Sequence, residues 1–440
     1  MVKGLRKGVV APLYLLSIVF IVLLSACSIQ KAQKTLLQTT ALKGAHVGIA
    51  VYNDTKQAWI DQYQSDHYFT PASNTKILAT YVGLKYLGDS LPGFSMAENA
   101  DTLFLTPLGD PSFLHPDFTY QPVVDLIRQT TKQIVITATK NTDHFEAFGD
   151  GWAWNDYNED YQPERSRMPI YGNLVHFNQE AGKVAVRPNY FFKHIVDLNA
   201  ASGKNWTRKK VGNVFYTTNQ KNTETYFQVP FSQYFEPILP IQLLKDTLKK
   251  QIHYAYGIHR MVGNEKIIKT VPTDSLLKIM MSRSDNFFAD QILLMASEQF
   301  LGNMDDAAFI DTVIKTEFID LPQPMRWADG SGLSRYNLNT PENYIAILKQ
   351  MQAKYGESRV RNIFEKGGEG TLSAYYKNFP GSIYAKTGTL GGQIALSGFI
   401  YTQHDQKLYF SVLVANHMSK TTSAVRKAVE AYLVKLASKN

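Results

Sequence analysis

The feature that most constrains this chain is the hexapeptide at residues 71–76, Pro-Ala-Ser-Asn-Thr-Lys, which lies between a predicted hairpin and a predicted helix. Ser73 stands where a helix cap belongs, and Lys76 follows three residues later. That spacing puts the two side chains on one helical face, one turn apart. A serine hydroxyl becomes a good nucleophile when a neighbouring base removes its proton. A lysine can be that base if burial, nearby cations and a helix N-terminus lower its pKa.

The S-x-x-K spacing occurs three times in the chain, but only the copy at Ser73 has a strand-then-helix setting. Alternating residues over 46–52 and 58–63, parted by a polar turn, predict a β-hairpin before it. The apolar run over 77–87 predicts a helix after it. Ser73 is therefore the candidate nucleophile and Lys76 its candidate base.

The string Ser284-Asp285-Asn286 lies between two predicted helices and offers partners for this pair. A second serine beside a nucleophile–lysine pair can relay a proton to a leaving amine. An asparagine amide can both donate to and accept from a peptide substrate. Ser284 and Asn286 are therefore candidate site residues.

The string Lys386-Thr387-Gly388-Thr389 ends a predicted strand. Lys386 would supply positive potential, and the two threonine hydroxyls could bind a carboxylate. Gly388 would let a ligand approach the strand backbone closely, because it has no side chain. Donors of this kind, together with backbone N–H groups, can form an oxyanion hole.

The N-terminus indicates export. Lys3, Arg6 and Lys7 precede an uncharged apolar run over 9–26, as in a secretory signal. Cys27 is the only cysteine, so no intramolecular disulfide can form. The four residues that end at Cys27 resemble the bacterial lipoprotein box, which implies acylation of that cysteine and a lipid anchor on a membrane. An uncleaved membrane anchor and a plain signal peptide are the alternatives, and each still exports the chain.

Composition excludes few functions. The chain has 440 residues, of which 44% are hydrophobic, which suits a globular protein of two or more domains. A formal net charge of +8 suits work near acidic polymers or a membrane surface. No nucleic-acid-binding motif supports a nucleic-acid partner. The basic cluster of Lys204 and residues 208–210 is interpreted as a solvated loop.

The predicted elements describe an α+β protein with one discontinuous domain. The N-terminal hairpin and three predicted strands near the C-terminus share an antiparallel sheet with helices packed on it. Between them, short β-like runs broken by turn residues form an inserted β-rich domain. The predicted divisions are a signal peptide (1–26), a lipid-anchored tether (27–42), a catalytic domain in two parts (43–88 and 231–440) and the insertion (89–230).

The order S-x-x-K, S-D-N, K-T-G is the set found in β-lactamases and penicillin-binding proteins. The chain resembles the class C low-molecular-mass penicillin-binding proteins, which are D-alanyl-D-alanine carboxypeptidases and endopeptidases. Three further stretches carry the resemblance, namely Gly-Asp-Pro-Ser-Phe at 109–113, Gly-Trp-Ala-Trp-Asn-Asp at 151–156 and Ala-Asp-Gly-Ser-Gly-Leu-Ser-Arg at 328–335. The implied fold is the serine β-lactamase/transpeptidase-like fold with an insertion between the first two motifs.

The resemblance implies a mechanism. Ser73 attacks the carbonyl between two D-alanines of a peptidoglycan stem peptide, and Lys76 takes its proton. Ser284 and Lys386 pass a proton to the leaving amine, and Asn286 holds the substrate amide. The terminal carboxylate binds at Thr387 and Thr389, and the backbone N–H groups of Ser73 and Thr389 form the oxyanion hole. Water then releases the acyl group, no metal or organic cofactor takes part, and β-lactam antibiotics are expected covalent inhibitors.

Asp156 and Arg335 match family positions that contact the diamino-acid side chain of the stem peptide. A turn cap for Asp156 and a surface ion pair for Arg335 are the structural alternatives. Family members often carry a glutamine at the position of Gly391, so the side-chain preference of this chain is expected to differ.

Two other functions fit the same fold. A β-lactamase of the commonest class needs a carboxylate that activates water, usually in E-x-x-L-N, and that string is absent. A catalytically silent peptidoglycan-binding lipoprotein would have lost at least one reactive residue, and all five are present. The peptidase is therefore the preferred prediction.

Overall fold

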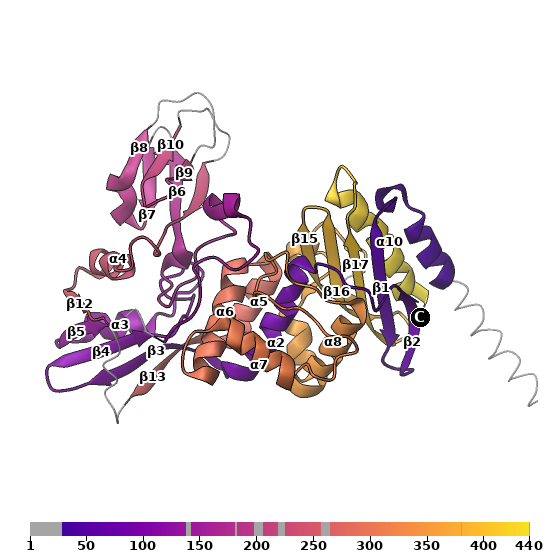
Figure 1. The fold of residues 1–440 in the computed structure, drawn as a ribbon, viewed down its shortest axis with the longest axis horizontal. Coiled ribbons are helices and arrows are strands. Elements are labelled where there is room, and N and C mark those ends of the chain that lie inside the picture. The colour runs from indigo at the N-terminus through magenta and orange to yellow at the C-terminus, as the bar shows by residue number, and fades with distance from the viewer. Residues whose placement is uncertain are drawn as a thin grey trace, which may run out of the picture.

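The computed structural model describes residues 29–137, 142–180, 183–197, 206–218, 225–256, 265–379 and 381–439. Its main sheet has six strands in the order β14-β15-β16-β17-β1-β2, and every neighbouring pair is antiparallel (Figure 1). The predicted hairpin and the three predicted C-terminal strands all lie in it. The strands are β1 (His46–Asn53), β2 (Ala58–Tyr63), β14 (Glu365–Lys366), β15 (Ile383–Leu390), β16 (Gln393–Tyr401) and β17 (Lys407–Ala415).

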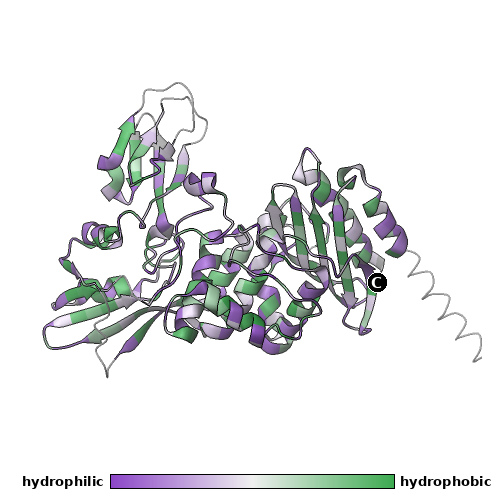
Figure 2. Cartoon of the chain, in the orientation of Figure 1, coloured by the Kyte–Doolittle hydropathy of each residue, from purple (hydrophilic) through white to green (hydrophobic). Residues whose placement is uncertain are grey.

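Helices cover both faces of this sheet. Alternate residues of β1 point to opposite sides, so Ala50 packs with one helical layer while Ile49 and Val51 pack with the other. Burial on both faces explains why β1 and β17 are largely apolar along most of their length, as the green segments of the main sheet in Figure 2 indicate. The larger layer contains α2 (Lys76–Tyr86), α5 (Thr273–Arg283), α6 (Asn286–Leu301), α7 (Asp306–Thr316), α8 (Pro341–Tyr355) and α9 (Glu357–Ile363), and the smaller one contains α10 (Thr422–Lys439).

The predicted polar tether is wrong from residue 29 onward. Residues 29–37 are helical and lie beside α10 in Figure 1. Ile29, Ala32 and Leu36 are buried in the same core as α10. Their spacing places them on one face of a helix, a pattern that the many polar residues between them concealed. The signal peptide and Cys27 lie outside the described residues.

The described residues of the insertion form three further sheets. One has five strands in the order β12-β5-β4-β3-β13, and two have three strands each, β11-β6-β7 and β8-β10-β9 (Figure 1). All three contribute to one hydrophobic core, together with α3 and α4. The elements are β3 (Ser90–Glu98), β4 (Thr102–Pro107), α3 (Pro122–Gln129), β5 (Gln133–Ile136), β6 (Leu174–Glu180), β7 (Lys183–Arg187), β8 (Ile195–Asp197), β9 (Trp206–Arg208), β10 (Phe215–Thr217), β11 (Tyr226–Pro230), α4 (Leu239–Leu248), β12 (Ile252–Tyr254) and β13 (Lys266–Pro272).

The sheet pairing favours an end of the insertion near residue 272 over the predicted end at residue 230. β13 pairs with β3, and β12 pairs with β5, so both late strands belong to the five-stranded sheet. This long-range pairing has no local signature in the sequence. β3 itself was missed because Pro92 and Gly93 interrupt its alternation.

Buried arginines join the insertion to the helical layer. Arg165 forms an ion pair with Asp306 at the start of α7, at 2.5 Å. Arg167 pairs with Asp143 and, at 2.8 Å, with Glu298 on α6. An unpaired buried charge is costly. These ion pairs therefore favour one position of the insertion against α6 and α7.

The interpretation of the basic cluster as a solvated loop is wrong for Arg208. Its side chain is buried, donates to the carbonyl oxygen of Pro230 at 2.8 Å and faces Glu164 at 3.8 Å. A buried counter-charge can come from a distant part of the chain, which a charge count along the sequence does not register. Lys204 lies outside the described residues.

Candidate active site

Ser73 lies in a short 3-10 turn, Ala72–Thr75, which leads directly into α2. The prediction that Ser73 caps the helix is wrong, because the α-helix begins at Lys76 and no side chain caps either element. Instead the hydroxyl of Ser73 accepts a hydrogen bond from the Lys76 amine at 3.1 Å. The turn thus leaves the hydroxyl free for chemistry rather than committing it to a backbone N–H.

The Lys76 amine is fully buried and has three acceptors. Besides Ser73, it donates to Asn286 Oδ1 at 2.5 Å and to the carbonyl oxygen of Ser331 at 2.7 Å. Burial lowers the pKa of Lys76 to about 8, although the carboxylates of Asp290 and Asp329 favour its charged form. This lowered pKa leaves a minor neutral fraction of the amine at pH 7 that grows as the pH rises, and the neutral amine can act as a general base toward Ser73.

Ser284 and Lys386 form a second contact of the same kind. Ser284 ends α5 in the left-handed conformation, with φ 60°, and Asp285 caps α6 by accepting from the Phe288 N–H. Lys386 on β15 donates to Ser284 Oγ at 2.9 Å. Burial, and then the positive charges of Lys76 and Arg426, hold the pKa of Lys386 well below its usual value. Ser284 therefore contacts one of the two buried amines and also lines the cleft that Ser73 lines.

The loop over residues 328–335 fixes the position of Ser331. Asp329 accepts from the backbone N–H groups of Gly332 and Ser334, at 2.9 and 2.7 Å, and from the indole of Trp152 at 2.8 Å. A side chain at Gly332, where φ is +85°, would place its Cβ 1.9 Å from the carbonyl oxygen of Ala72. The glycine therefore allows the loop to touch the turn that carries Ser73.

Gly388 serves the same purpose on the other side of the turn. A Cβ there would lie 2.7 Å from the Pro71 carbonyl oxygen and 3.0 Å from the Ser73 nitrogen. The absence of a side chain at Gly388 therefore allows close contact between β15 and the Ser73 turn, whereas the sequence predicted that it makes room for a ligand. Thr387 is buried and bonds to the hydroxyl of Thr371 at 2.9 Å, so its hydroxyl is already engaged.

Thr389 is exposed, and its hydroxyl accepts from the guanidinium of Arg426 on α10 at 2.6 Å. This cation has no motif in the sequence, because α10 follows the K-T-G string only after two further strands. An arginine beside an exposed threonine at the end of β15 is suited to binding a carboxylate.

A cleft of about 620 Å³ is lined by several of these groups, although Arg426 is not among its lining residues. Ser73, Ser284, Asn286 and Thr389 line it, whereas Lys76, Lys386 and Thr387 lie behind its wall. Asp156 and Arg335 line the same cleft, as does Gly391. A Cβ at Gly391 would lie 3.5 Å from Arg335 Nη2, so the guanidinium lies close to that glycine.

Several residues of the site were not predicted from the sequence. Tyr161 lines the cleft, and its carbonyl oxygen accepts from the Asn286 amide at 2.9 Å. Asp290 accepts from the Gly330 N–H at 2.7 Å; burial and then the Asp329 charge raise its pKa to about 7. The Ser331 carbonyl and Arg426 complete this group. Only the glycine-rich string at 328–335 was visible in the sequence as a motif.

The fold and the site are those of a serine acyl-transfer enzyme in which a buried lysine amine contacts the candidate nucleophile. Residues 29–222 and 238–439 match the model of the D-Ala-D-Ala carboxypeptidase 3 (S13) family. The chain belongs to this family.

Named relatives agree with this assignment. D-alanyl-D-alanine carboxypeptidase DacB of Haemophilus influenzae is 22% identical over 420 residues, covering 84% of this chain and 85% of the relative. The crystal structure of penicillin binding protein 4 (dacB) from the same organism has a TM-score of 0.72 at 19% identity, covering 93% of this chain and 99% of that one. A predatory peptidoglycan endopeptidase of Bdellovibrio bacteriovorus has a TM-score of 0.52 at 15% identity, covering 89% and 92%. The predicted α+β fold with an additional β-rich part is thereby confirmed.

The pKa of Lys76 sets the expected pH dependence of acylation. If its neutral amine is the base, the rate of Ser73 acylation should rise with pH and reach half of its plateau near pH 8, the value to which burial lowers the pKa. Stopped-flow acylation by a chromogenic β-lactam measures this profile. Asp290→Asn removes a negative charge that favours the ammonium form, so it should move the midpoint to lower pH. A rate that stays flat from about pH 6 to 10 would contradict the role of Lys76.

Proposed function

We propose that this chain is a serine-type D-alanyl-D-alanine carboxypeptidase and endopeptidase that acts on peptidoglycan stem peptides through an acyl-enzyme on Ser73. The observation that carries the proposal is the contact of a buried lysine amine with the Ser73 hydroxyl, in a chain that belongs to the S13 family. Trimming of a terminal D-alanine and cutting of a cross-link use the same chemistry and differ in the leaving group.

The proposed reaction proceeds in two steps. Ser73 Oγ forms a bond to the carbonyl carbon of the penultimate D-alanine while its proton passes to the Lys76 amine. The C–N bond then breaks, and the proton that Lys76 took passes through Ser284, which Lys386 orients, to the leaving amine, so that Lys76 is neutral again. In the second step water adds to the acyl carbon, Ser73 leaves and regains a proton, and the free enzyme is restored. Backbone N–H groups of Ser73 and Thr389 are the proposed oxyanion hole.

Two ends of the cleft are proposed to recognise the substrate. Thr389 in the cleft, and Arg426 that donates to it from α10, would hold the carboxylate of the leaving D-alanine, because burial disfavours the charged form of Lys386 and Thr387 is bonded to Thr371. At the other end, Asp156 and Arg335 would hold the amino and carboxylate groups of the diamino acid. Oppositely charged partners in a partly enclosed cleft favour that arrangement.

Labelling with a fluorescent penicillin tests the nucleophile. The wild-type protein should form a stable covalent adduct, and Ser73→Ala should lose it completely because no other hydroxyl contacts Lys76 in the described site. Ser331→Ala is the matched control, since Lys76 contacts the Ser331 carbonyl and not its hydroxyl. Mass analysis of muropeptides should show loss of D-alanine and cleavage of cross-links. Rapid turnover of the penicillin would favour a β-lactamase, and no adduct would favour a silent binding protein.

The recognition roles are tested by two alanine variants that serve as controls for each other. Arg426→Ala should raise KM roughly tenfold for peptides that end in a free carboxylate, and less for peptides that end in an ester. Asp156→Ala should raise KM for peptides with a free diamino-acid amine, and less for simple D-Ala-D-Ala esters. Steady-state kinetics on the four substrate types separate the two effects. Equal losses on all four would refute both roles.

The proposed location is the cell envelope, with the chain anchored by lipid on Cys27. Among the described residues, no helix is both long and apolar enough to cross a bilayer. The lipoprotein-like sequence that ends at Cys27 supports acylation as the means of attachment. A cell-wall substrate requires that the chain be exported, whether it works in a periplasm or in another compartment outside the cytoplasm.

The anchor is tested by cell fractionation. Cys27→Ala should move the protein from the membrane pellet to the soluble fraction, because the acylated residue is lost, while Ser28→Ala should leave it in the pellet. Membrane association that survives Cys27→Ala would sink the lipid-anchor proposal.

A further inference from the structure

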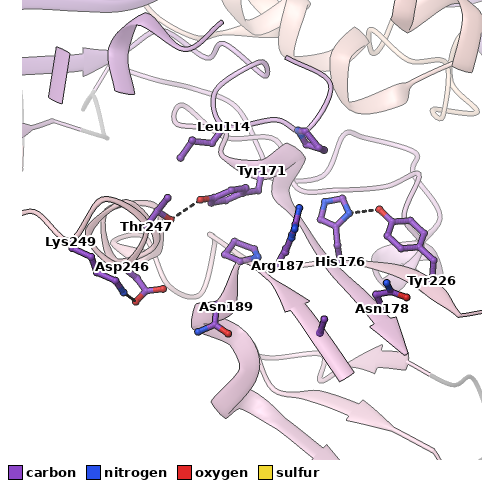
Figure 3. Close-up of a pocket in the computed structure, with 13 residues that line it drawn as sticks. Leu114, Tyr171, His176, Asn178, Arg187, Asn189, Tyr226, Asp246, Thr247 and Lys249 are labelled. Carbon is purple, nitrogen blue, oxygen red and sulfur yellow. Dashed lines mark hydrogen bonds and ion pairs between the residues drawn. The ribbon is translucent and has the colours of Figure 1, made fainter. Parts of the chain in front are cut away.

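A second cavity, of about 840 Å³, lies within the insertion (Figure 3). Its volume falls in the range of small-molecule sites. One side is formed by the sheet β11-β6-β7, and the others by the end of α4 and the loop at residues 114–116. None of the residues predicted for the active site lines it.

The sheet presents one apolar face and one polar face. Val175 and Phe177 of β6 are buried in the core of the insertion, so their neighbours His176 and Asn178 point to the opposite side. Strand register places Arg187 opposite His176, and Tyr226 opposite Asn178. All four line the cavity. The polar face is thus a platform of aromatic, amide and cationic groups from three strands.

Two tyrosines of the cavity are held by their hydroxyl groups. Tyr226 bonds to His176 Nδ1 at 2.5 Å, and Tyr171 bonds to Thr247 Oγ1 at 2.6 Å (Figure 3). Tyr226 is nevertheless 54% exposed. An exposed ring whose polar end is already satisfied can offer its faces to a ligand at little cost in conformational entropy.

The charges of the cavity favour an anionic or strongly polar ligand. Asp246 is paired with Lys249 at 2.7 Å, whereas the exposed Arg187 has no ion pair within the described part of the chain. Burial holds the pKa of His176 below its usual value, so Arg187 is the main free charge on the platform. Amide, aromatic and guanidinium groups together suit a ligand with acetamido and hydroxyl groups, an apolar ring face and carboxylates. A chain of N-acetylated amino sugars with pendant acids has these features.

The loop at residues 114–118 joins this cavity to the active site. Leu114 and Pro116 line the cavity. Asp117 forms an ion pair with Arg283 at 2.5 Å, immediately before Ser284, and the His115 ring contacts the Phe288 ring at a centroid distance of 5.0 Å. One loop therefore borders the second cavity on one side and supports the Ser284 turn on the other.

We propose that this cavity is a subsite for the N-acetylated sugar strand of the polymer whose peptide is cut at Ser73. The proposal rests on the proposed function, because it assigns the second cavity to another part of the same substrate. The sugar strand packs on Tyr226 and Tyr171, and Arg187 binds a carboxylate that the strand carries. Attachment to a strand then strengthens binding of the scissile peptide without changing the reaction at Ser73.

The experiment compares free and strand-attached peptides on the full chain. Arg187→Ala and Tyr226→Ala should each raise KM about tenfold for peptides attached to soluble sugar strands, because a charge-assisted or stacking contact is lost. KM for the free peptide and the rate of penicillin acylation should stay at wild-type values. Arg187→Lys should recover part of the loss. Arg326→Ala and Tyr234→Ala, which remove exposed residues of the same types outside the cavity, are the controls.

A direct binding measurement distinguishes a failure of this proposal from a failure of the proposed function. Soluble sugar strands stripped of peptides, titrated calorimetrically into the Ser73→Ala variant, should bind, and Arg187→Ala in that background should weaken binding about tenfold. This measurement needs no turnover, so it decides on the cavity even if wild-type protein hydrolyses no peptide. No binding, or binding that both cavity variants leave unchanged, overturns the proposal. Thermal unfolding of each variant identifies a misfolded protein, and the exposed Arg187 keeps the test valid if Tyr226→Ala is unstable.

Discussion

The site depends on keeping one amine out of water. Lys76 is surrounded by protein, and its three hydrogen bonds go to groups that are uncharged: a hydroxyl, an amide and a carbonyl. Carboxylates lie one shell further out, at Asp290 and Asp329, where they limit the fall in the pKa of Lys76 without pairing with it. A direct salt bridge would have held the amine fully protonated and removed its use as a base. The contacts of the Ser73 turn with β15 and with the loop at 328–335 keep this amine buried.

Close packing around the Ser73 turn keeps the Lys76 amine away from water. The turn is held between β15 and the loop at 328–335, and the contacts pass through Gly388 and Gly332, where a methyl group would overlap with backbone atoms. The insertion supports the same loop, since Trp152 donates to Asp329. Ion pairs from Arg165 and Arg167 hold the insertion against α6 and α7. The β-rich part is therefore structurally connected to the catalytic centre as well as being a candidate surface for substrate.

Local periodicity predicted many, but not all, of the elements that bury a regular face. The hairpin, the helices that follow Ser73 and Ser284, and the last three strands were all predicted from periodicity, because each packs on the main sheet or its helical layer. β3 was missed because Pro92 and Gly93 interrupt its alternation, although its partner β4 follows directly. β13 was missed, and its partner β3 lies far away in the sequence. The helix at 29–37 was missed because three apolar residues among many polar ones suffice when α10 supplies the rest of the core.

The order and spacing of three short motifs were enough to name candidate reactive groups, and the structure brings residues of all three motifs to one cleft. Folding alone determined their surroundings. The carbonyl that contacts Lys76, the arginine beside Thr389 and the role of Gly388 as a packing contact all depend on segments brought together from distant positions. Burial, which moves the pKa values of both lysines, is a property of the packed molecule, and no residue carries it in isolation.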